Sequence, residues 1–209
     1  TIAYRIKGKT TYAMEGSIFI AGAGVQWLSD KLNFFKNASE TENIVKSLKD
    51  NKGVYLVPAF TGLGAPYWDA NARGVLSGLT RDTGPKEIIR ATIESVAYQT
   101  YDLFEAMKHD GLRPRLVKVD GGMVMNNWFS QFLSNVVDIK VLRPKVQETT
   151  ALGAAFMAGL QIGVYKSLKD ISKNWHLDKN FTPKINSKER NNLVRGWSAA
   201  IRKTLTKTI

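Results

Sequence analysis

The sequence contains no cysteine and only two histidines, His109 and His176, among its 209 residues. The lack of cysteine excludes disulfide bonds, thiolate metal sites and a cysteine nucleophile. Two histidines are too few for a metal site built from several imidazoles, so no metal-ligating residue is assigned. No signal segment opens the chain and no run of about 18 uncharged apolar residues occurs, so we expect a cytoplasmic protein without membrane insertion.

Two common nucleotide-binding motifs are also missing. No GxxxxGK[ST] is present, so any bound nucleotide is not held by a Walker loop. No GxGxxG follows a strand-like run, which removes the usual dinucleotide motif. A binding site for a nucleotide therefore has to be sought in other glycine-rich segments.

Acidic residues are few: 18 Asp and Glu stand against 30 Lys and Arg, for a net charge of +12. Such a charge favours nucleic acid, an acidic membrane surface or a phosphorylated small molecule as partner. The basic residues are dispersed, with denser stretches only at 184–195 and 202–207, as is typical of solvated helix faces. The tryptophans, such as Trp27 and Trp197, fall on apolar helix faces and not beside a basic stripe, so we expect no nucleic-acid partner.

Hydrophobic periodicity predicts an α/β fold. Apolar runs and alternations predict strands at residues 1–6, 10–14, 54–57, 75–79, 116–119 and 140–142. Steps of three and four residues predict helices at 17–32, 39–50, 85–107, 126–138, 148–160, 167–175 and 187–207, with a polar connector before the last. Strands alternating with helices favour a largely parallel sheet. A chain that opens in mid-hairpin without Met is expected to be a fragment.

The segment KVDGGMVMNN, residues 118–127, places Gly121 and Gly122 between an expected strand and an expected helix. Such junctions favour anions, because backbone N–H groups and the helix dipole face the ligand there. Two missing Cβ atoms allow a phosphate or ribose close to the main chain and permit a positive φ. The alternative is a tight turn ordered by Asp120. Asn126 is interpreted either as a cap of the next helix or as a ligand contact.

Other glycines and carboxylates leave alternatives open. Gly22 and Gly24 lie in an expected helix, where glycine costs about 1 kcal/mol against alanine. Both a ligand and a tight helix crossing explain them. Gly153 is interpreted as a helix-packing glycine, and the glycine-rich loop at 60–74 as functional. Because no spacing defines a partner for them, four carboxylates are interpreted as structural: Glu15, Asp69, Glu94 and Asp120.

Several longer motifs resemble one known family. GVLSGLTRDTGPKEIIRATIE, residues 74–94, resembles the second signature of the FGGY carbohydrate kinases: a Gly-Leu pair, a seven-residue spacer, an acidic residue with Ile, then Ala-Thr-Ile-Glu. Four further stretches resemble the branch of that family that phosphorylates glycerol: MEGSIFIAGAGVQWL, VPAFTGLGAPYWDANARG, VDGGMVMNN and ETTALGAA. The resemblance is collinear from Thr1 to near the last expected helix.

This resemblance implies an actin-like, ribonuclease-H-like ATPase fold, with a central mixed sheet flanked by helices. Two such domains close over ATP and the substrate in the family, and residues 1–209 resemble the C-terminal nucleotide-binding domain alone. By the same resemblance, the contacts to ATP or ADP, with Mg²⁺, are Gly22, Gln26, Gly121, Gly122 and Asn126.

The resemblance also implies that the catalytic parts lie elsewhere. The family's phosphate loop, catalytic aspartate, main glycerol contacts and glycine-threonine loop have no match here, so no catalytic residue is assigned. We expect the full-length protein to phosphorylate glycerol together with its N-terminal kinase domain and to form homo-oligomers, and the present chain to be inactive alone. The alternatives are a family kinase for another polyol or sugar and a non-catalytic nucleotide-binding module.

Overall fold

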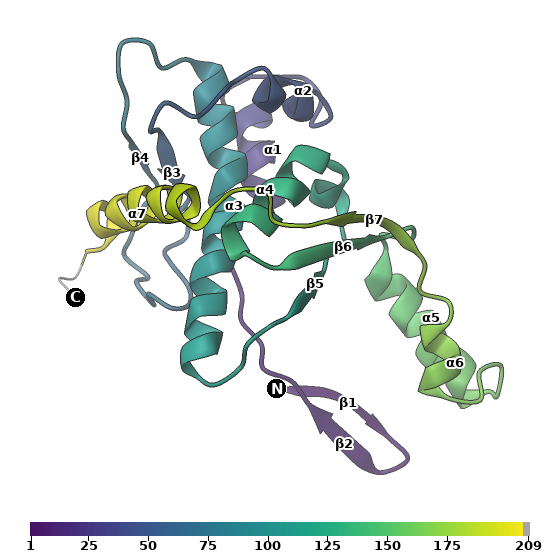
Figure 1. Cartoon of the computed structure of the whole chain (residues 1–209). Helices are drawn as coiled ribbons and strands as arrows, with labels where there is room; N and C mark the ends of the chain where they lie inside the picture. Colours follow the sequence, from purple (N-terminus) through teal and green to yellow (C-terminus); the bar gives the residue numbers. More distant parts are fainter. Residues whose placement is uncertain (207–209) are drawn as a thin grey trace.

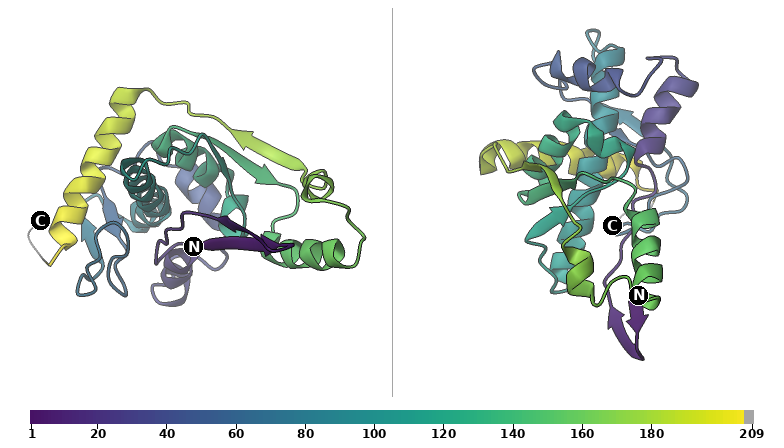
Figure 2. Two further views of the ribbon diagram at one scale, coloured as in Figure 1. Left: turned by 90° about the horizontal axis from the view of Figure 1, so that it is seen from below. Right: turned by 90° about the vertical axis from the view of Figure 1, so that its right-hand side faces the viewer.

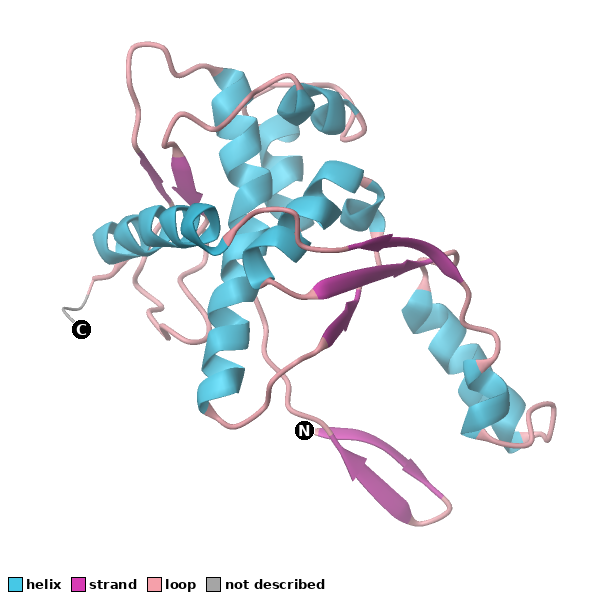
Figure 3. Ribbon diagram, in the orientation of Figure 1, coloured by secondary structure: helices cyan, strands magenta, loops and turns pink. Residues whose placement is uncertain are grey.

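The computed structural model describes residues 1–206, in which short strands and helices surround one long helix (Figures 1 and 3). The helices are α1 (Gly22–Asp30), α2 (Glu40–Lys46), α3 (Pro85–His109), α4 (Asn127–Val137), α5 (Thr149–Gln161), α6 (Leu168–Ser172), α7 (Ser187–Thr204) and a 3₁₀ turn, η1 (Gly122–Met125). The strands are β1 (Ile2–Ile6), β2 (Lys9–Tyr12), β3 (Tyr55–Val57), β4 (Val75–Ser77), β5 (Leu116–Lys118), β6 (Lys140–Pro144) and β7 (Leu177–Phe181).

The expected helices are confirmed, with shifted ends. Helix α1 begins at Gly22 and not at residue 17, so that glycine stands in the first turn. Helix α7 ends at Thr204, while Lys207, its expected end, lies outside the described residues. Within residues 1–206 no helix is both long enough and apolar enough to cross a membrane.

The strands form three small sheets. β1–β2 and β3–β4 are antiparallel pairs, and β5–β6–β7 is a mixed sheet in which β5 runs parallel to β6 and β7 antiparallel to it. The expectation of a largely parallel sheet is wrong, because β5–β6 is the single parallel pair among the described strands. The mixed character of the β5–β6–β7 sheet is as expected.

Strand β7 occupies a segment that was expected to be a polar connector. Of its five residues only Phe181 is buried, so the apolar alternation that predicts a strand is absent. The strand forms because β6 offers an unpaired edge to it, with Val141 opposite Phe181 and Arg143 opposite Lys179. A neighbouring strand thus decided its conformation.

Helix α3 is the centre of the hydrophobic core and packs against α1, α2, α4 and β3. Pro85 occupies its first turn, where the missing N–H costs nothing, and the Glu87 carboxylate accepts the Gly84 N–H at 2.9 Å. Tyr98 stacks on the Trp197 ring at 5.3 Å and meets the Phe132 ring edge-on at 5.6 Å. Burial of each such ring contributes on the order of 2 to 3 kcal/mol.

Both tryptophans expected in the core pack there. Trp197 is fully buried, and Trp27 is partly buried against the core with its ring 4.9 Å from that of Phe60. The interpretation of Gly153 is wrong, because a Cβ atom built there meets no described atom within 4 Å. Its helix α5, with α6 and the β1–β2 hairpin, extends away from α3 (Figures 1 and 2).

Buried carboxylates fasten the segments around α3. Glu94 is 1% exposed and accepts from Arg90 Nε at 2.8 Å and from Asn51 Nδ2 at 2.7 Å. Asp69 in the 60–74 loop accepts from the backbone N of Thr206 at 2.7 Å. Both residues are therefore structural, as expected, and the loop is tied to the end of α7.

A third carboxylate, Asp102 on α3, joins α7 to the same loop. It accepts from Trp197 Nε1 at 2.6 Å and from the Tyr67 hydroxyl at 2.8 Å. Burial raises the pKa of Asp102 to about 6, and these two hydrogen bonds offset only part of that effect.

We predict that Asp102→Asn flattens the pH dependence of stability between about pH 4 and 6. In this window folded Asp102 keeps a proton that the unfolded chain, with a pKa of 3.8, has lost, so its contribution falls as pH rises. Asparagine keeps the acceptor and does not titrate. Urea unfolding measures the free energy of unfolding at each pH. Its fall between pH 4 and 6 should be smaller in the variant by about 1 to 3 kcal/mol.

The matched control is Asp110→Asn, which alters an exposed aspartate at the end of the same helix. It should leave the pH profile as it is in the unmodified protein. Parallel profiles for Asp102→Asn and the unmodified protein would contradict the assignment.

Candidate functional site

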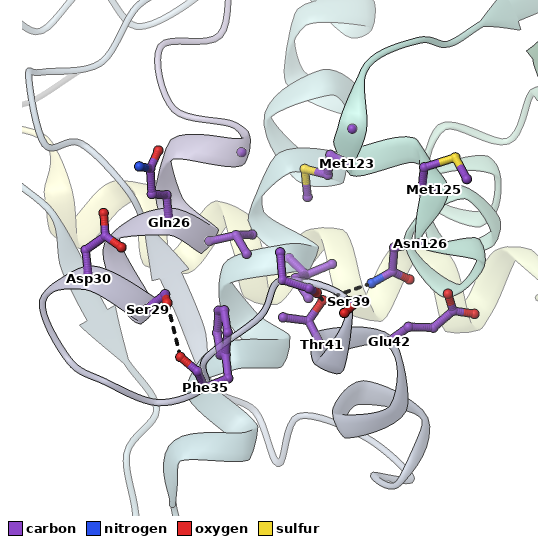
Figure 4. A pocket seen from close by; sticks show the side chains of 15 residues that line it. Gln26, Ser29, Asp30, Phe35, Ser39, Thr41, Glu42, Met123, Met125 and Asn126 are labelled. Carbon is purple, nitrogen blue, oxygen red and sulfur yellow. Dashed lines mark hydrogen bonds between the residues drawn. The ribbon is translucent and has the colours of Figure 1, made fainter. Parts of the chain in front are cut away.

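A cavity of about 570 Å³ opens between α1, α2 and η1 (Figure 4). This volume lies within the range of small-molecule pockets. Its floor is apolar and its rim carries amides, hydroxyls and carboxylates. The lining residues are Gly22, Val25, Gln26, Ser29, Asp30, Phe35, Ala38, Ser39, Thr41, Glu42, Ile93, Gly122, Met123, Met125 and Asn126.

The surroundings of Gly22 and Gly24 at the start of α1 show which of them serves a tight helix crossing and which leaves space for a ligand. A Cβ atom on Gly24 would approach Thr92 Cγ2 of α3 to 3.2 Å, so Gly24 allows a close helix crossing. A Cβ atom on Gly22 would meet no described atom within 4 Å, and Gly22 lines the cavity. Packing therefore explains Gly24, while Gly22 keeps the cavity wall free of a side chain.

The Asp-Gly-Gly turn forms the opposite wall. Gly121 has φ +82°, a left-handed conformation that favours glycine, as its position in the turn predicted. Gly122 begins η1 and lines the cavity, and a Cβ atom there would again meet no described atom within 4 Å. Asp120 accepts from the Thr149 hydroxyl at the start of α5, so it fastens the turn to that helix.

Asn126 serves as a helix cap and as part of the cavity wall. Its Oδ1 accepts from the backbone N of Phe129 at 3.0 Å, which caps α4. Its Nδ2 donates to Thr41 Oγ1 at 3.4 Å across the cavity edge (Figure 4). The cap is therefore confirmed, while the ligand contact of Asn126 stays a prediction.

Glu42, on α2, is a site residue that sequence reasoning missed. Its carboxylate accepts from the backbone N and from Nδ2 of Asn127, each at 3.2 Å, and pairs with Lys46. Burial alone would raise the pKa of Glu42, but the hydrogen bonds from Lys46 and Asn127 outweigh it and hold the pKa below its usual value. The carboxylate is therefore ionised at neutral pH and accepts hydrogen bonds.

The charge around the cavity contrasts with that of the whole chain. Among the described residues that line it, Asp30 and Glu42 are acidic and none is Lys or Arg. In residues 1–206, no three His, Cys, Asp or Glu side chains gather in a way that could hold a metal ion. The cavity thus suits an uncharged, amphipathic ligand group with donors at its edge, and not a bare anion.

An apolar cavity between the first residues of α1 and η1, each an exposed glycine, gives this α/β chain a candidate small-molecule site. The family model described as "FGGY family of carbohydrate kinases, C-terminal domain" matches residues 3–162. The chain belongs to this family.

Known members cover nearly the whole chain. Glycerol kinase 1 of Pseudomonas aeruginosa is 54% identical over 203 residues, which are 97% of this chain and 41% of that protein. The crystal structure of Plasmodium falciparum glycerol kinase with ADP superposes with a TM-score of 0.89 at 36% identity, over 100% of this chain and 42% of that one. A ligand-bound xylulose kinase from Lactobacillus acidophilus shares the fold, with a TM-score of 0.75 at 24% identity over 90% of this chain and 38% of its own.

These matches confirm the expected fold class, an actin-like α/β ATPase domain. The chain spans about two fifths of the length of the curated relatives that it matches, as the 41% coverage shows.

The structure places four of the five predicted nucleotide contacts around one cavity and the fifth beside it. Gly22, Gln26, Gly122 and Asn126 line the cavity, and Gly121 is the residue preceding Gly122. Their role as nucleotide contacts stays a prediction. The wall contributed by α2, with Thr41 and Glu42, was not foreseen, because nothing in its sequence indicates which distant segment it faces.

We predict that Gly24→Val lowers the free energy of unfolding by about 1 to 3 kcal/mol, because the added side chain collides with Thr92. Gly22→Val, two residues earlier in the same helix, should change it by less than about 1 kcal/mol, because its Cβ enters open space. Urea denaturation of both variants measures the difference. Equal losses would show that Gly22 also serves packing.

Proposed function

We propose that this chain is the C-terminal, adenine-nucleotide-binding half of a kinase that phosphorylates glycerol to glycerol 3-phosphate. The observation that carries the proposal is the gathering of Gly22, Gln26, Gly122 and Asn126 around one cavity. Support comes from the superposition on a glycerol kinase with ADP and from relatives named glycerol kinase at 50–54% identity.

In this proposal each part of the cavity meets one part of ATP. The adenine ring packs on the apolar floor around Val25 and Ile93, where its flat face replaces water. The amides of Gln26 and Asn126 hydrogen-bond the adenosine, and Glu42 accepts from a hydroxyl or amino group. The two exposed glycines let ribose and phosphates approach the main chain.

The phosphates need positive charge that the cavity lining lacks. Mg²⁺, bound to the phosphates themselves, supplies charge neutralisation when it is present. Since no described cluster in this chain fits a metal ion, we assign it no metal ligand here. The remaining contacts, and the aspartate that acts as base toward the glycerol hydroxyl, belong in this proposal to the N-terminal domain.

The proposal favours glycerol over another polyol. Relatives named glycerol kinase reach 54% identity, whereas the xylulose and gluconate kinases of Lactobacillus acidophilus, at 24%, share the fold alone. A cytoplasmic location, homo-oligomers of the full-length protein and the absence of a nucleic-acid partner remain predictions from the sequence.

We predict that Gly122→Val in the full-length protein weakens ADP binding at least about tenfold. A branched side chain there projects into the cavity and blocks the approach of a ligand. The melting temperature without nucleotide should stay within about 2 °C, since the Cβ meets no described atom. Isothermal titration calorimetry with ADP measures the binding.

Gly122→Ala extends this experiment to a graded series. Its smaller side chain should weaken ADP binding less than valine does. Unchanged affinity in both variants would mean that Gly122 serves only the turn.

We also predict that residues 1–209 alone do not turn over glycerol, because half of a cleft cannot position both substrates for phosphoryl transfer. A coupled assay with Mg-ATP measures ADP release from the fragment and from the full-length protein. Full-length protein should be active on glycerol and much less active on xylulose or gluconate. Glycerol-dependent turnover by the fragment would contradict the division of the site between two domains.

A further inference from the structure

Arg143, the fourth of the five residues of β6, is a buried cation behind the cavity wall. It is 6% exposed, and its guanidinium lies against the Phe181 ring with its carbon 5.8 Å from the ring centre. A buried arginine is costly unless its donors are well paired, so its partners show what the fold uses it for.

Two of these partners belong to η1, the turn between Gly122 and Asn126. Nη1 of Arg143 donates to the carbonyl oxygen of Val124 at 2.7 Å and to that of Met125 at 3.3 Å. Both carbonyl oxygens thus accept hydrogen bonds from a side chain of β6. The guanidinium therefore holds the segment that carries two of the proposed nucleotide contacts.

A third partner connects Arg143 to the opposite wall. Nη2 donates to Oδ1 of Asn127 at 3.3 Å, and the backbone N and Nδ2 of Asn127 donate to Glu42. Lys179 Nζ donates to the same Asn127 oxygen at 3.1 Å, which fixes the amide orientation. One polar chain thus joins β6, the start of α4 and α2.

The guanidinium itself is oriented from β7. Asp178 accepts from Nε of Arg143 at 2.7 Å. Since Nε, Nη1 and Nη2 are all engaged, the plane of the guanidinium is defined in three directions. Lysine, with one ammonium group on a flexible stem, cannot reproduce this fork.

We propose that Arg143 is a positioning residue of the nucleotide site. It sets the location of η1 and α2, and so the distance between two cavity walls: the one that carries Gly122 and Asn126 and the one that carries Glu42. This inference rests on the proposed function of the cavity. Loss of the guanidinium hydrogen bonds allows the two walls to shift. Nucleotide binding then has to order them again, which makes the free energy of binding less favourable. Arg143 is not among the residues that line the cavity, so it acts through the residues that it holds.

The test compares two buried arginines in the full-length protein. Arg90 is 8% exposed and likewise binds a carboxylate, Glu94, through Nε and a carbonyl oxygen, that of Leu48, through Nη1 at 2.7 Å. None of these partners lines the cavity. Arg90→Lys therefore reports the general cost of replacing a buried, forked arginine.

Both Arg143→Lys and Arg90→Lys should lower the melting temperature. Only Arg143→Lys should raise the Kd for ADP and the KM for ATP, each about tenfold, as expected for the loss of one or two charge-assisted hydrogen bonds. The kcat at saturating ATP should stay within about threefold of that of the unmodified protein, since bound ATP restores the walls. Calorimetry with ADP and steady-state kinetics give these values.

Asp178→Asn keeps the arginine and removes only its charged partner, so it serves if Arg143→Lys does not fold. It should raise the Kd for ADP about threefold. Unchanged Kd and KM in a folded Arg143→Lys variant would overturn the positioning role. Where that variant fails to fold, unchanged values in Asp178→Asn would do the same. Equal increases in Kd for Arg143→Lys and Arg90→Lys would also overturn it. An unmodified protein that does not bind ADP would overturn the proposed function, and the role of Arg143 with it.

Discussion

Burial of the middle turns of α3 is the constraint on which the rest of this structure depends. Every residue of the helix from Ile89 to Tyr98 is buried, the four polar ones included, so this segment is stable only when other elements cover all of its faces and pair its polar groups. Helices α1, α2 and α4 and strand β3 do so, and the Tyr98 ring with Trp197 brings in α7. The cavity follows from this arrangement: α1, α2 and η1 approach one another because each is held to the same core, with Ile93 of α3 at the cavity floor.

The charge around the candidate site differs from that of the whole chain. The chain carries a net charge of +12, yet its cavity is lined by two carboxylates and, among the described residues, by no basic side chain. In the proposed function this surface takes the adenosine, whereas the triphosphate needs cations from elsewhere. This agrees with the proposal that a second domain and Mg²⁺ complete the site, and with the 41% share of its relatives' length that the chain spans. The buried cation behind the wall, Arg143, pairs with Asp178 and donates hydrogen bonds to two carbonyl oxygens of η1.

Features within one element could be predicted from the sequence, and features between elements could not. The helices followed from periodicity, and Gly121 from the turn chemistry of Asp-Gly-Gly, because both are properties of adjacent residues. Strand β7 was missed, since its edge position needs no apolar alternation. Gly153 was assigned to packing on composition alone, although the described structure offers it no neighbour. Glu42 carries no local sign that it faces Asn127, 85 residues later.

The sequence by itself determined the helices, the glycine turn after Asp120 and, through motifs in a fixed order, the family. Tertiary structure alone decided which glycine serves which purpose: Gly24 meets Thr92 of α3, while Gly22 and Gly122 face one cavity from elements about a hundred residues apart. It also decided that Arg143 supports that cavity from behind. The physical reason is that propensity and turn chemistry act over a few residues, whereas close packing and the pairing of buried polar groups depend on which distant segments the core brings into contact.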